Sequence, residues 1–332
     1  MVGRMNVATP MSTTAPDLLR LEDLSVSFAG REGRARAVRG VSLSVPAGRT
    51  VGIVGESGSG KSVTMMAVMG LLPANARREG SVYWDGVDVT NGSQLDRMRG
   101  RELAMVFQDP VSSLNPLMTI GRQVAEVLRV HQGMSTRAAR SRSRDLLSLV
   151  GISSVDRVLD SYPHELSGGM CQRVMIAGAL ASEPKLLIAD EPTTALDVTI
   201  QAQLLDLLID LQRTLGIGII LISHDLAVVA QVCEYIAVMY AGRIVESGLA
   251  DEILSDPRHP YTRALIALSP RLHGDRRRLI PIAGRPPDAH EDLEGCAFAS
   301  RCVEAELTSC RREPPVVELT AGRQVRCWHA LT

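Results

Sequence analysis

The sequence is short of aromatic residues, of long apolar runs and of net charge. Only 3% of its 332 residues are aromatic, while 45% are hydrophobic, so aliphatic side chains must build the core. The longest apolar stretch, near Ile217 to Ile222, is far too short to span a bilayer. A formal net charge of -1 leaves no basic excess for nucleic acid. We therefore expect a globular protein that neither spans a membrane nor binds nucleic acid.

The N-terminal residues lack the apolar core of a signal peptide. Residues 1–18 are rich in Thr, Pro, Ala and Met, which is typical of a disordered lead-in. The chain is long enough for one large α/β domain and an appendage, and no internal repeat is evident. We expect a cytoplasmic protein with a single principal domain.

A glycine-rich loop follows the short apolar run from Thr50 to Val54. It reads Gly55-Glu56-Ser57-Gly58-Ser59-Gly60-Lys61-Ser62-Val63, and an apolar stretch without proline continues to Leu72. The order strand, loop and helix predicts a phosphate-binding loop, whose glycines let successive backbone N–H groups point inward. Lys61 would reach the outer phosphates of a bound nucleotide, and the Ser62 hydroxyl would bind Mg²⁺. The alternative is a glycine-rich turn that binds nothing.

A second apolar run, Lys185 to Ala189, ends in Asp190-Glu191-Pro192. Both carboxylates should emerge at the carboxyl end of a central parallel strand, where open α/β sheets bind their ligands. Asp190 would orient the Mg²⁺ shell, and Glu191 would accept a proton from the water that attacks the γ-phosphate, or polarise it. The alternative is a pair of solvated acids that caps a turn.

Four further motifs identify a family. They are Val106-Phe107-Gln108-Asp109-Pro110, Leu166-Ser167-Gly168-Gly169-Met170, Ala195-Leu196-Asp197 and Ser223-His224-Asp225. With the two nucleotide motifs, and in this order, they resemble the ATP-binding subunits of ABC transporters, within them the oligopeptide and dipeptide importer group. The resemblance runs from about Leu19 to the C-terminus. It implies an α/β P-loop NTPase cassette: a RecA-like core with a β-subdomain, an inserted α-helical subdomain and a C-terminal extension.

The resemblance assigns roles to single residues. Phe28 would stack on adenine, although it could be an ordinary half-buried strand residue. Gln108 would complete the Mg²⁺ shell or touch the attacking water. His224 would contact the γ-phosphate, with a structural histidine as the alternative.

The resemblance also implies that two cassettes pair head to tail. Ser167, Gly168 and Gly169 of one cassette would close over the γ-phosphate held by the other, and Asp197 would belong to the D-loop. Ser167 would in addition begin a helix as its N-cap. Cys171, where relatives commonly carry a polar residue, is interpreted as a small packing residue. One chain would then supply half of each reaction centre.

The transporter that the resemblance implies contains further subunits. These are two transmembrane permeases, a second and non-identical ATPase subunit, and an extracellular substrate-binding protein. The chain would lie at the cytoplasmic face of the membrane and hydrolyse ATP to drive uptake of di- or oligopeptides. Closely similar cassettes serve nickel and glycoside importers, which remain an alternative, and a soluble nucleic-acid-associated ABC ATPase is a more distant one.

The residue patterns divide the chain into consecutive regions. Residues 19–107 read as strands around the loop helix, with a strand and turn between Gly80 and Thr90. Helical spacing marks Ile120 to Val130 and Arg140 to Val150, and residues 180–248 read as buried strands that alternate with helices in a parallel sheet. We place the ATPase domain at 19–250, its helical subdomain at about 109–178 and the extension at 251–332.

Four of the six cysteines lie in the extension, at Cys296, Cys302, Cys310 and Cys327. Five, seven and sixteen residues separate them, unlike the close pairs of common zinc sites, and a reducing cytosol disfavours disulfides. Some relatives carry a four-iron cluster on four matching cysteines, so the resemblance implies a [4Fe-4S] cluster. Tetrahedral zinc and free thiols remain the alternatives.

Overall fold

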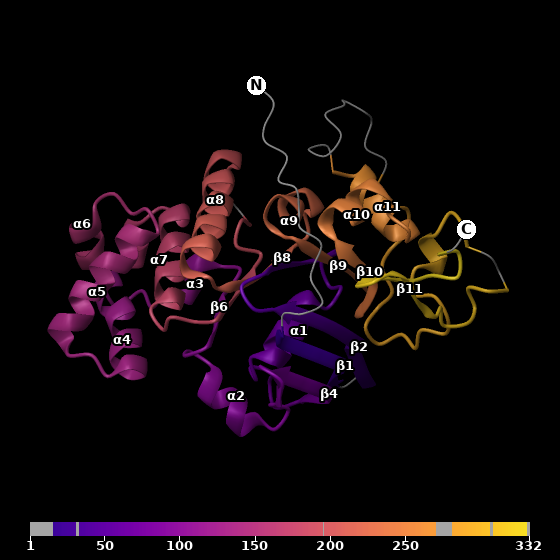
Figure 1. Ribbon diagram of the computed structural model, residues 1–332, viewed down its shortest axis with the longest axis horizontal. Coiled ribbons are helices and arrows are strands. Elements are labelled where there is room, and N and C mark those ends of the chain that lie inside the picture. Colours follow the sequence, from indigo (N-terminus) through magenta and orange to yellow (C-terminus); the bar gives the residue numbers. More distant parts are fainter. Residues whose placement is uncertain (1–15, 31–32, 195, 270–280, 306–307, 331–332) are drawn as a thin grey trace.

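The computed structural model describes residues 16–30, 33–194, 196–269, 281–305 and 308–330. A four-stranded antiparallel sheet and an eight-stranded mixed sheet organise these residues. Figure 1 shows the helical region, residues 110–180, at one end and the C-terminal residues at the other, with the sheets between them. The chain therefore has the predicted α/β class.

The antiparallel sheet has the order β2-β1-β4-β5. Its strands are β1 (Asp17–Gly30), β2 (Gly33–Pro46), β4 (Ala76–Trp84) and β5 (Val87–Asp88). The strand and turn predicted between Gly80 and Thr90 are confirmed by β4 and β5. The predicted lead-in ends too late, because Asp17 pairs with Pro46 and the Leu18 side chain is buried. Residues 1–15 of that lead-in lie outside the described residues.

The larger sheet has the order β11-β12-β10-β9-β3-β8-β7-β6. Its strands are β3 (Thr50–Val54), β6 (Leu103–Val106), β7 (Leu186–Asp190), β8 (Gly218–Ser223), β9 (Tyr235–Tyr240), β10 (Arg243–Leu249), β11 (Val316–Thr320) and β12 (Arg323–Arg326). The five strands from β6 to β9 in this order pair in parallel. Because β3, β7 and β8 are buried on both faces, they read as continuous apolar runs in the sequence.

The parallel arrangement ends at β9. The prediction of a parallel sheet as far as residue 248 is wrong for β10, which pairs antiparallel with β9. Only Ala241 and Gly242 connect the two strands, both with positive φ, and so short a turn cannot form a parallel crossover. Strand β12 then pairs with β10, and β11 with β12. The C-terminal extension therefore continues the core sheet instead of forming a separate appendage.

Helices cover both faces of this sheet. They are α1 (Lys61–Val68), α2 (Gly92–Met98), α3 (Pro110–Ser113), α4 (Ile120–Gln132), α5 (Thr136–Leu149), α6 (Val155–Asp160), η1 (Pro163–Glu165), α7 (Gly168–Leu180), α8 (Val198–Leu215), α9 (Leu226–Val232), α10 (Ala250–Ser255), α11 (Pro260–Ala267) and η2 (Ala299–Arg301). The predicted helices at 120–130 and 140–150 are confirmed by α4 and α5. Helix α5 begins earlier because the Ser135 hydroxyl accepts the Ala138 N–H. Helix α1 stops before Leu72, because Gly70 adopts a left-handed conformation just past its end.

The core divides into one apolar cluster on each face of the large sheet. Along β8, Ile219 and Leu221 belong to one cluster, and Ile220 and Ile222 belong to the other. The few aromatic residues are not spread evenly through this core. The rings of Tyr240, Tyr261 and Phe298 contact one another where the extension meets the sheet.

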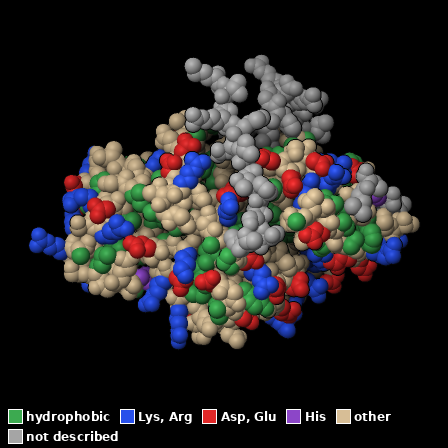
Figure 2. Space-filling model, viewed as in Figure 1, with side chains coloured by type: hydrophobic (Ala, Val, Ile, Leu, Met, Phe, Trp, Pro, Cys, Tyr) green, Lys and Arg blue, Asp and Glu red, His purple; other side chains and the backbone are tan. Residues whose placement is uncertain are grey.

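Among the described residues, no helix combines the length and the apolar character needed to cross a bilayer. Figure 2 shows acidic and basic side chains interspersed over the visible face, in keeping with the net charge of -1.

Candidate functional site

The large sheet brings the predicted motifs together at one edge. Strands β3, β6, β7 and β8 are parallel neighbours, so the segments that follow them meet at the same end of the sheet. A cavity of about 920 Å³ opens there, a size suited to a nucleotide. It is lined by Ser57, Gly58, Gly60, Lys61, Ser62, Val63, Gln108, Glu191 and His224, among others.

The glycine-rich loop is closely packed against the strands beside it. A Cβ atom on Gly60, whose φ is 100°, would lie 2.4 Å from the Ala37 carbonyl oxygen. One on Gly55 would lie 2.1 Å from the Met239 carbonyl oxygen. Gly55 and Ser59 are buried, and neither is among the residues that line the cavity. Gly55 and Gly60 are required because any larger residue would keep the loop backbone from lying so close to its neighbours.

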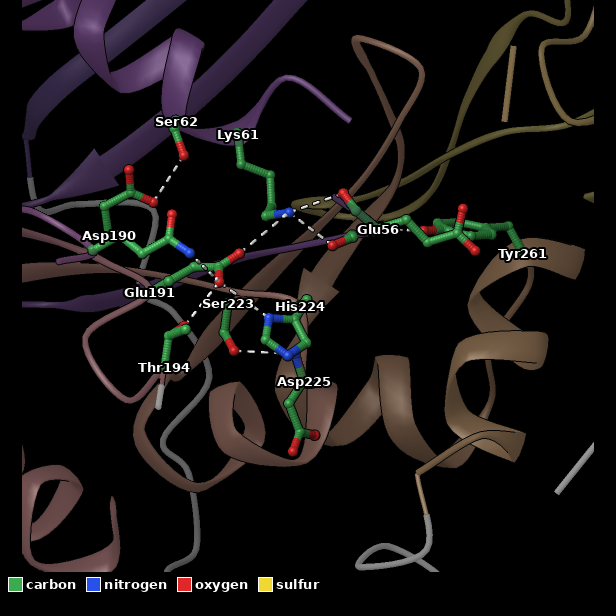
Figure 3. Close-up of polar contacts among 12 residues, drawn as sticks. Glu56, Lys61, Ser62, Asp190, Glu191, Thr194, Ser223, His224, Asp225 and Tyr261 are labelled. Carbon is green, nitrogen blue, oxygen red and sulfur yellow. Dashed lines mark hydrogen bonds and ion pairs between the residues drawn. The ribbon is translucent and has the colours of Figure 1, made fainter. Parts of the chain in front are cut away.

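Lys61 is held inside the loop. Its Nζ donates to the carbonyl oxygens of Gly55 at 2.8 Å and Glu56 at 3.0 Å, and it lies 4.0 Å from Glu191 Oε1 (Figure 3). Burial lowers the pKa of Lys61, and the nearby Glu191 carboxylate acts in the opposite direction. An ammonium group with so little water around it can exchange carbonyl oxygens for phosphate oxygens.

Two of the three predicted Mg²⁺ ligands are in contact. Ser62 Oγ donates to Asp190 Oδ1 at 2.9 Å. Burial raises the pKa of Asp190, and the Ser62 hydrogen bond opposes that rise. Hydroxyl and carboxylate oxygens are the hard ligands that Mg²⁺ prefers. The third residue, Gln108, instead donates from Nε2 to Glu191 Oε2 at 3.3 Å.

Glu191 is the meeting point of the site. Its carboxylate oxygen Oε2 accepts from Thr194 Oγ1 at 3.0 Å and lies 3.2 Å from His224 Nδ1 (Figure 3). The backbone of Glu191 has φ 45°, and its N–H donates to the Ile222 carbonyl at 2.9 Å. A non-glycine residue in this left-handed region stores strain, which clusters at functional sites. The side chain is 13% exposed, so it contacts the cavity without being solvated freely.

Sequence reasoning missed Thr194. The Thr194 N–H also donates to the Glu191 carbonyl at 3.1 Å, which closes a turn around the carboxylate. The segment Glu191-Pro192-Thr193-Thr194 has the proline and hydroxyl residues of such a turn, so a signal was present.

Phe28 is not brought to the cavity. It is partly buried on β1, pairs with Ala35 and Ala76, and packs against the core. Of the described residues in this sheet, Ala37 lines the cavity and Phe28 does not. Its position in the structure corresponds to the alternative of a half-buried strand residue.

The Leu166–Met170 motif lies away from this cavity. Ser167 is the N-cap of α7, as predicted, and its Oγ accepts the Met170 N–H at 3.4 Å. Ser167 and Gly168 are exposed and Gly169 is half-buried, and none of the three lines the chain's own cavity. Their backbone N–H groups at the helix start are therefore accessible to a second molecule.

Asp197 and Cys171 have structural contacts. The Asp197 carboxylate caps α8 by accepting the N–H groups of Thr199 and Ile200, both at 3.0 Å. Ala195 of the same motif lies outside the described residues. Cys171 is fully buried, its thiol donates to the Pro163 carbonyl at 3.5 Å, and burial raises its pKa. The interpretation of Cys171 as a packing residue is confirmed.

The four cysteines of the extension converge. All are free thiols, and burial raises the pKa of Cys296 to about 11, with a further rise from the neighbouring charges of Cys302, Cys310 and Cys327. Backbone N–H groups two residues downstream bond to the sulfurs of Cys296, Cys302 and Cys327. Across the described parts of the chain, however, no group of three or more Cys, His, Asp or Glu side chains is placed to hold a metal ion. The structure gathers the thiols without closing a metal site.

Comparisons with known families agree with this geometry. Residues 38–194 match the family described as ABC transporter. Residues 245–310 match the family described as oligopeptide/dipeptide transporter, C-terminal region. The second match covers most of β10, all of α10 and α11, and three of the four clustered cysteines.

Curated relatives match over nearly the whole chain. The oligopeptide transport ATP-binding protein OppD of Bacillus subtilis is 48% identical, over 94% of this chain and 88% of that protein. The dipeptide transport ATP-binding protein DppD of Escherichia coli is 48% identical, over 95% of this chain and 97% of that protein.

Solved structures give the same fold. The dimeric, post-hydrolysis ATP-binding cassette MJ0796 bound to ADP and phosphate has a TM-score of 0.63 and 30% identity, and covers 70% of this chain and 98% of that one. Clostridium perfringens cbiO1, part of the ABC transporter complex cbiONQ, has a TM-score of 0.61 and 29% identity, and covers 73% of this chain and 92% of that one. The motifs, their convergence at one sheet edge and these likenesses agree: the chain belongs to the oligopeptide/dipeptide transport family of ABC transporter ATP-binding proteins.

Proposed function

We propose that this chain hydrolyses ATP to power the import of di- or oligopeptides through a membrane transporter. The observation that carries the proposal is the arrangement around Glu191, whose carboxylate lies among Lys61, Gln108, Thr194 and His224 at the end of β7. The names of OppD and DppD, which are 48% identical over 94% and 95% of this chain, support a peptide as the cargo.

The chain's own residues divide the chemistry. The loop N–H groups and Lys61 bind the phosphates, and Ser62 with Asp190 holds Mg²⁺, which neutralises phosphate charge when bound. Glu191 takes the proton of the attacking water. Gln108 and His224, both within 3.3 Å of the Glu191 carboxylate, orient that water and contact the γ-phosphate. Phe28 remains a proposal for the adenine contact, although it is not among the residues that line the cavity.

The second half of the reaction centre comes from a partner cassette. Ser167, Gly168 and Gly169 close over the γ-phosphate bound by the partner, and the Asp197 segment lies at the same interface. The exposure of Ser167 and Gly168 and the dimeric form of MJ0796 support this pairing. The complete machine has a non-identical second cassette, two transmembrane permeases and an extracellular binding protein, and the chain lies at the cytoplasmic face of the membrane. We keep the ATPase domain at 19–250, extended at its start to Asp17 by the pairing of β1, with the helical subdomain at about 109–178 and the extension at 251–332.

Transport by the assembled complex tests the proposal. The complex is reconstituted into vesicles with ATP, and uptake of labelled di- and oligopeptides is compared with uptake of Ni²⁺ and of a glycoside. We expect ATP-dependent uptake of the peptides and no uptake of Ni²⁺ or of the glycoside. Uptake of Ni²⁺ or of the glycoside without peptide uptake would show that the cargo is not a peptide. Stimulation of the ATPase by RNA or DNA, without transport, would favour a nucleic-acid-associated ATPase instead of an importer.

We also propose that the four thiols hold a [4Fe-4S] cluster, with zinc as the alternative. The convergence of the four sulfurs supports a shared ligand set. Burial raises the pKa of Cys296, Cys302 and Cys327, and the N–H bonds to these three sulfurs act in the opposite direction by favouring the thiolate that binds a metal. Bound metal would tie η2 to the β11–β12 hairpin. Anaerobic purification followed by iron, sulfide and zinc analysis distinguishes an iron–sulfur cluster from zinc and from free thiols. Metal far below one equivalent per chain rejects both metals and leaves free thiols.

A further inference from the structure

One residue of the extension reaches the phosphate loop. Arg301 ends η2, immediately before Cys302. Its Nη1 donates to Glu56 Oε2 at 2.7 Å and its Nη2 donates to Glu56 Oε1 at 3.0 Å, across 245 residues of sequence. The Arg301 side chain is 4% exposed and that of Glu56 is 26% exposed. This two-pronged ion pair is largely shielded from water, where charge-assisted hydrogen bonds are strongest.

Arg301 uses every N–H of its guanidinium. Besides Glu56, Nη1 reaches Tyr240 Oη at 3.3 Å, Nε reaches the Ala283 carbonyl at 3.0 Å and Nη2 reaches the Ile282 carbonyl at 3.4 Å. The five donors thus join the loop, β9 and the segment at Ile282 and Ala283. A lysine has one nitrogen and cannot reproduce this planar set of contacts.

Glu56 is held on its backbone as well. Its N–H donates to Tyr261 Oη at 2.9 Å, and its carbonyl accepts from Lys61 Nζ at 3.0 Å and from the Ser59 N–H at 3.2 Å. Figure 3 shows Glu56 between the Lys61 ammonium and Tyr261 of α11. The conformation of the loop's first turn therefore depends on groups outside the loop.

Aromatic packing fixes the turn that carries Arg301. Phe298 is 3% exposed, and its ring centroid lies 5.2 Å from that of Tyr240, 5.3 Å from that of Tyr261 and 5.9 Å from that of His259. Shifting η2 would separate these rings, which stabilise one another beyond their buried area. Arg301 is thus presented to Glu56 from a rigid base.

We propose that Arg301 is a positioning residue for the phosphate loop, so that the ATP affinity of this cassette depends on its C-terminal extension. Arg301 does not line the cavity and acts through Glu56. Two effects follow from its loss. The loop must then be ordered when ATP binds, which costs affinity, and the released Glu56 carboxylate competes with phosphate for Lys61. The inference rests on the proposed function only in taking ATP as the ligand of the loop.

The test measures KM and kcat for ATP in the assembled transporter, and ATP-analogue binding to the purified full-length chain. Removing a charge-assisted pair should raise KM roughly tenfold in Arg301→Gln and Glu56→Gln, with kcat changed less than about threefold. Arg301→Lys should lie between wild type and Arg301→Gln. The double variant should be no worse than either single variant, because both remove the same interaction.

A matched control removes another ion pair of the extension. Arg263 Nη2 lies 2.7 Å from Glu304 Oε2, and this pair joins α11 to the segment just after η2 without touching the loop. Arg263→Gln should keep the wild-type KM. Melting temperatures of all variants separate a loss of fold from a loss of affinity.

The outcomes distinguish a failure of the role proposed for Arg301 from a failure of the proposed function. A folded Arg301→Gln with wild-type KM overturns the inference, and so do single effects that multiply in the double variant. If Arg301→Gln does not fold, Glu56→Gln carries the test, and an unchanged KM there is equally decisive. Failure of the wild type to bind ATP would instead remove the proposed function.

Discussion

The nucleotide edge and the C-terminal extension are built in opposite ways. At the edge, the side chains of Lys61, Glu191 and His224 follow buried parallel strands, and the sheet alone brings them together. In the extension, the described residues between 281 and 330 form only short elements, and aromatic and ionic contacts join them to the core. The first region is organised by backbone pairing, and the second by side chains.

Because of this difference, we expect mutations in the two regions to affect different properties of the protein. A change at the edge should alter chemistry and leave folding intact, because the strands beneath it are wholly buried and independent of the loop side chains. A change in the extension should alter stability first, and chemistry only through the contact with Glu56.

The largest effect is expected at Lys61. Lys61→Ala removes the ammonium from the phosphate site, and ATP hydrolysis should fall by at least about 100-fold. The chain's only other lysine, Lys185, pairs with Glu102 on the surface and supplies the control Lys185→Ala, which should keep wild-type turnover. Wild-type nucleotide affinity and rate in Lys61→Ala would end the loop assignment.

Glu191→Gln should separate binding from hydrolysis. The amide keeps the size of the side chain but cannot accept the proton of water, so turnover should fall by about 10² to 10⁴ while ATP stays bound and the paired state accumulates. Single-turnover hydrolysis and size-exclusion chromatography with ATP measure both. Glu183→Gln, which removes an exposed pair with Arg142, is the control. Unchanged turnover in the assembled complex would refute the role of Glu191.

Phe298→Ala tests whether the extension and the core fold together. Loss of the buried ring should lower the free energy of unfolding by about 3 to 5 kcal/mol, in one transition that includes the core. Calorimetry of Phe298→Ala and of Val303→Ala, which alters a side chain that is 95% exposed, gives the comparison. Two transitions, with the core melting as in wild type, would show that the extension is an independent unit.

The smallest effect concerns His259, whose Nδ1 accepts the Tyr261 N–H at the start of α11. Burial lowers its pKa to about 3 from 6.5, so the unfolded chain binds the proton first as the pH falls. The stability from the neutral ring is complete above pH 6.5 and is lost as the pH falls toward 3, by at most about 1.4 kcal/mol per pH unit.

His259→Asn keeps an acceptor for the helix start and removes the titration. Between pH 7.5 and 5.5, the variant should lose less stability than wild type, by about 1 kcal/mol in urea unfolding. The same pH dependence in both proteins would contradict the buried neutral state of His259.

Much of the nucleotide edge was predictable because its signals are local. The strand at Thr50 to Val54 was placed correctly from a short, mostly apolar run and the glycine after it. Phe28 was harder to place, since one aromatic residue on a strand carries no information about the face it occupies. The antiparallel direction of β10 was not predicted, because the apolar pattern did not distinguish the two-residue turn before β10 from a longer connection.

By itself, the sequence determined the family, the order of the motifs and the strands that carry them, because glycine conformation, apolar runs and helix caps act over a few residues. Only the tertiary structure decided that the extension joins the core sheet and that Arg301 holds Glu56. Those contacts join segments about 80 and 245 residues apart, and no local pattern encodes which distant partner will bury a charge or complete a sheet.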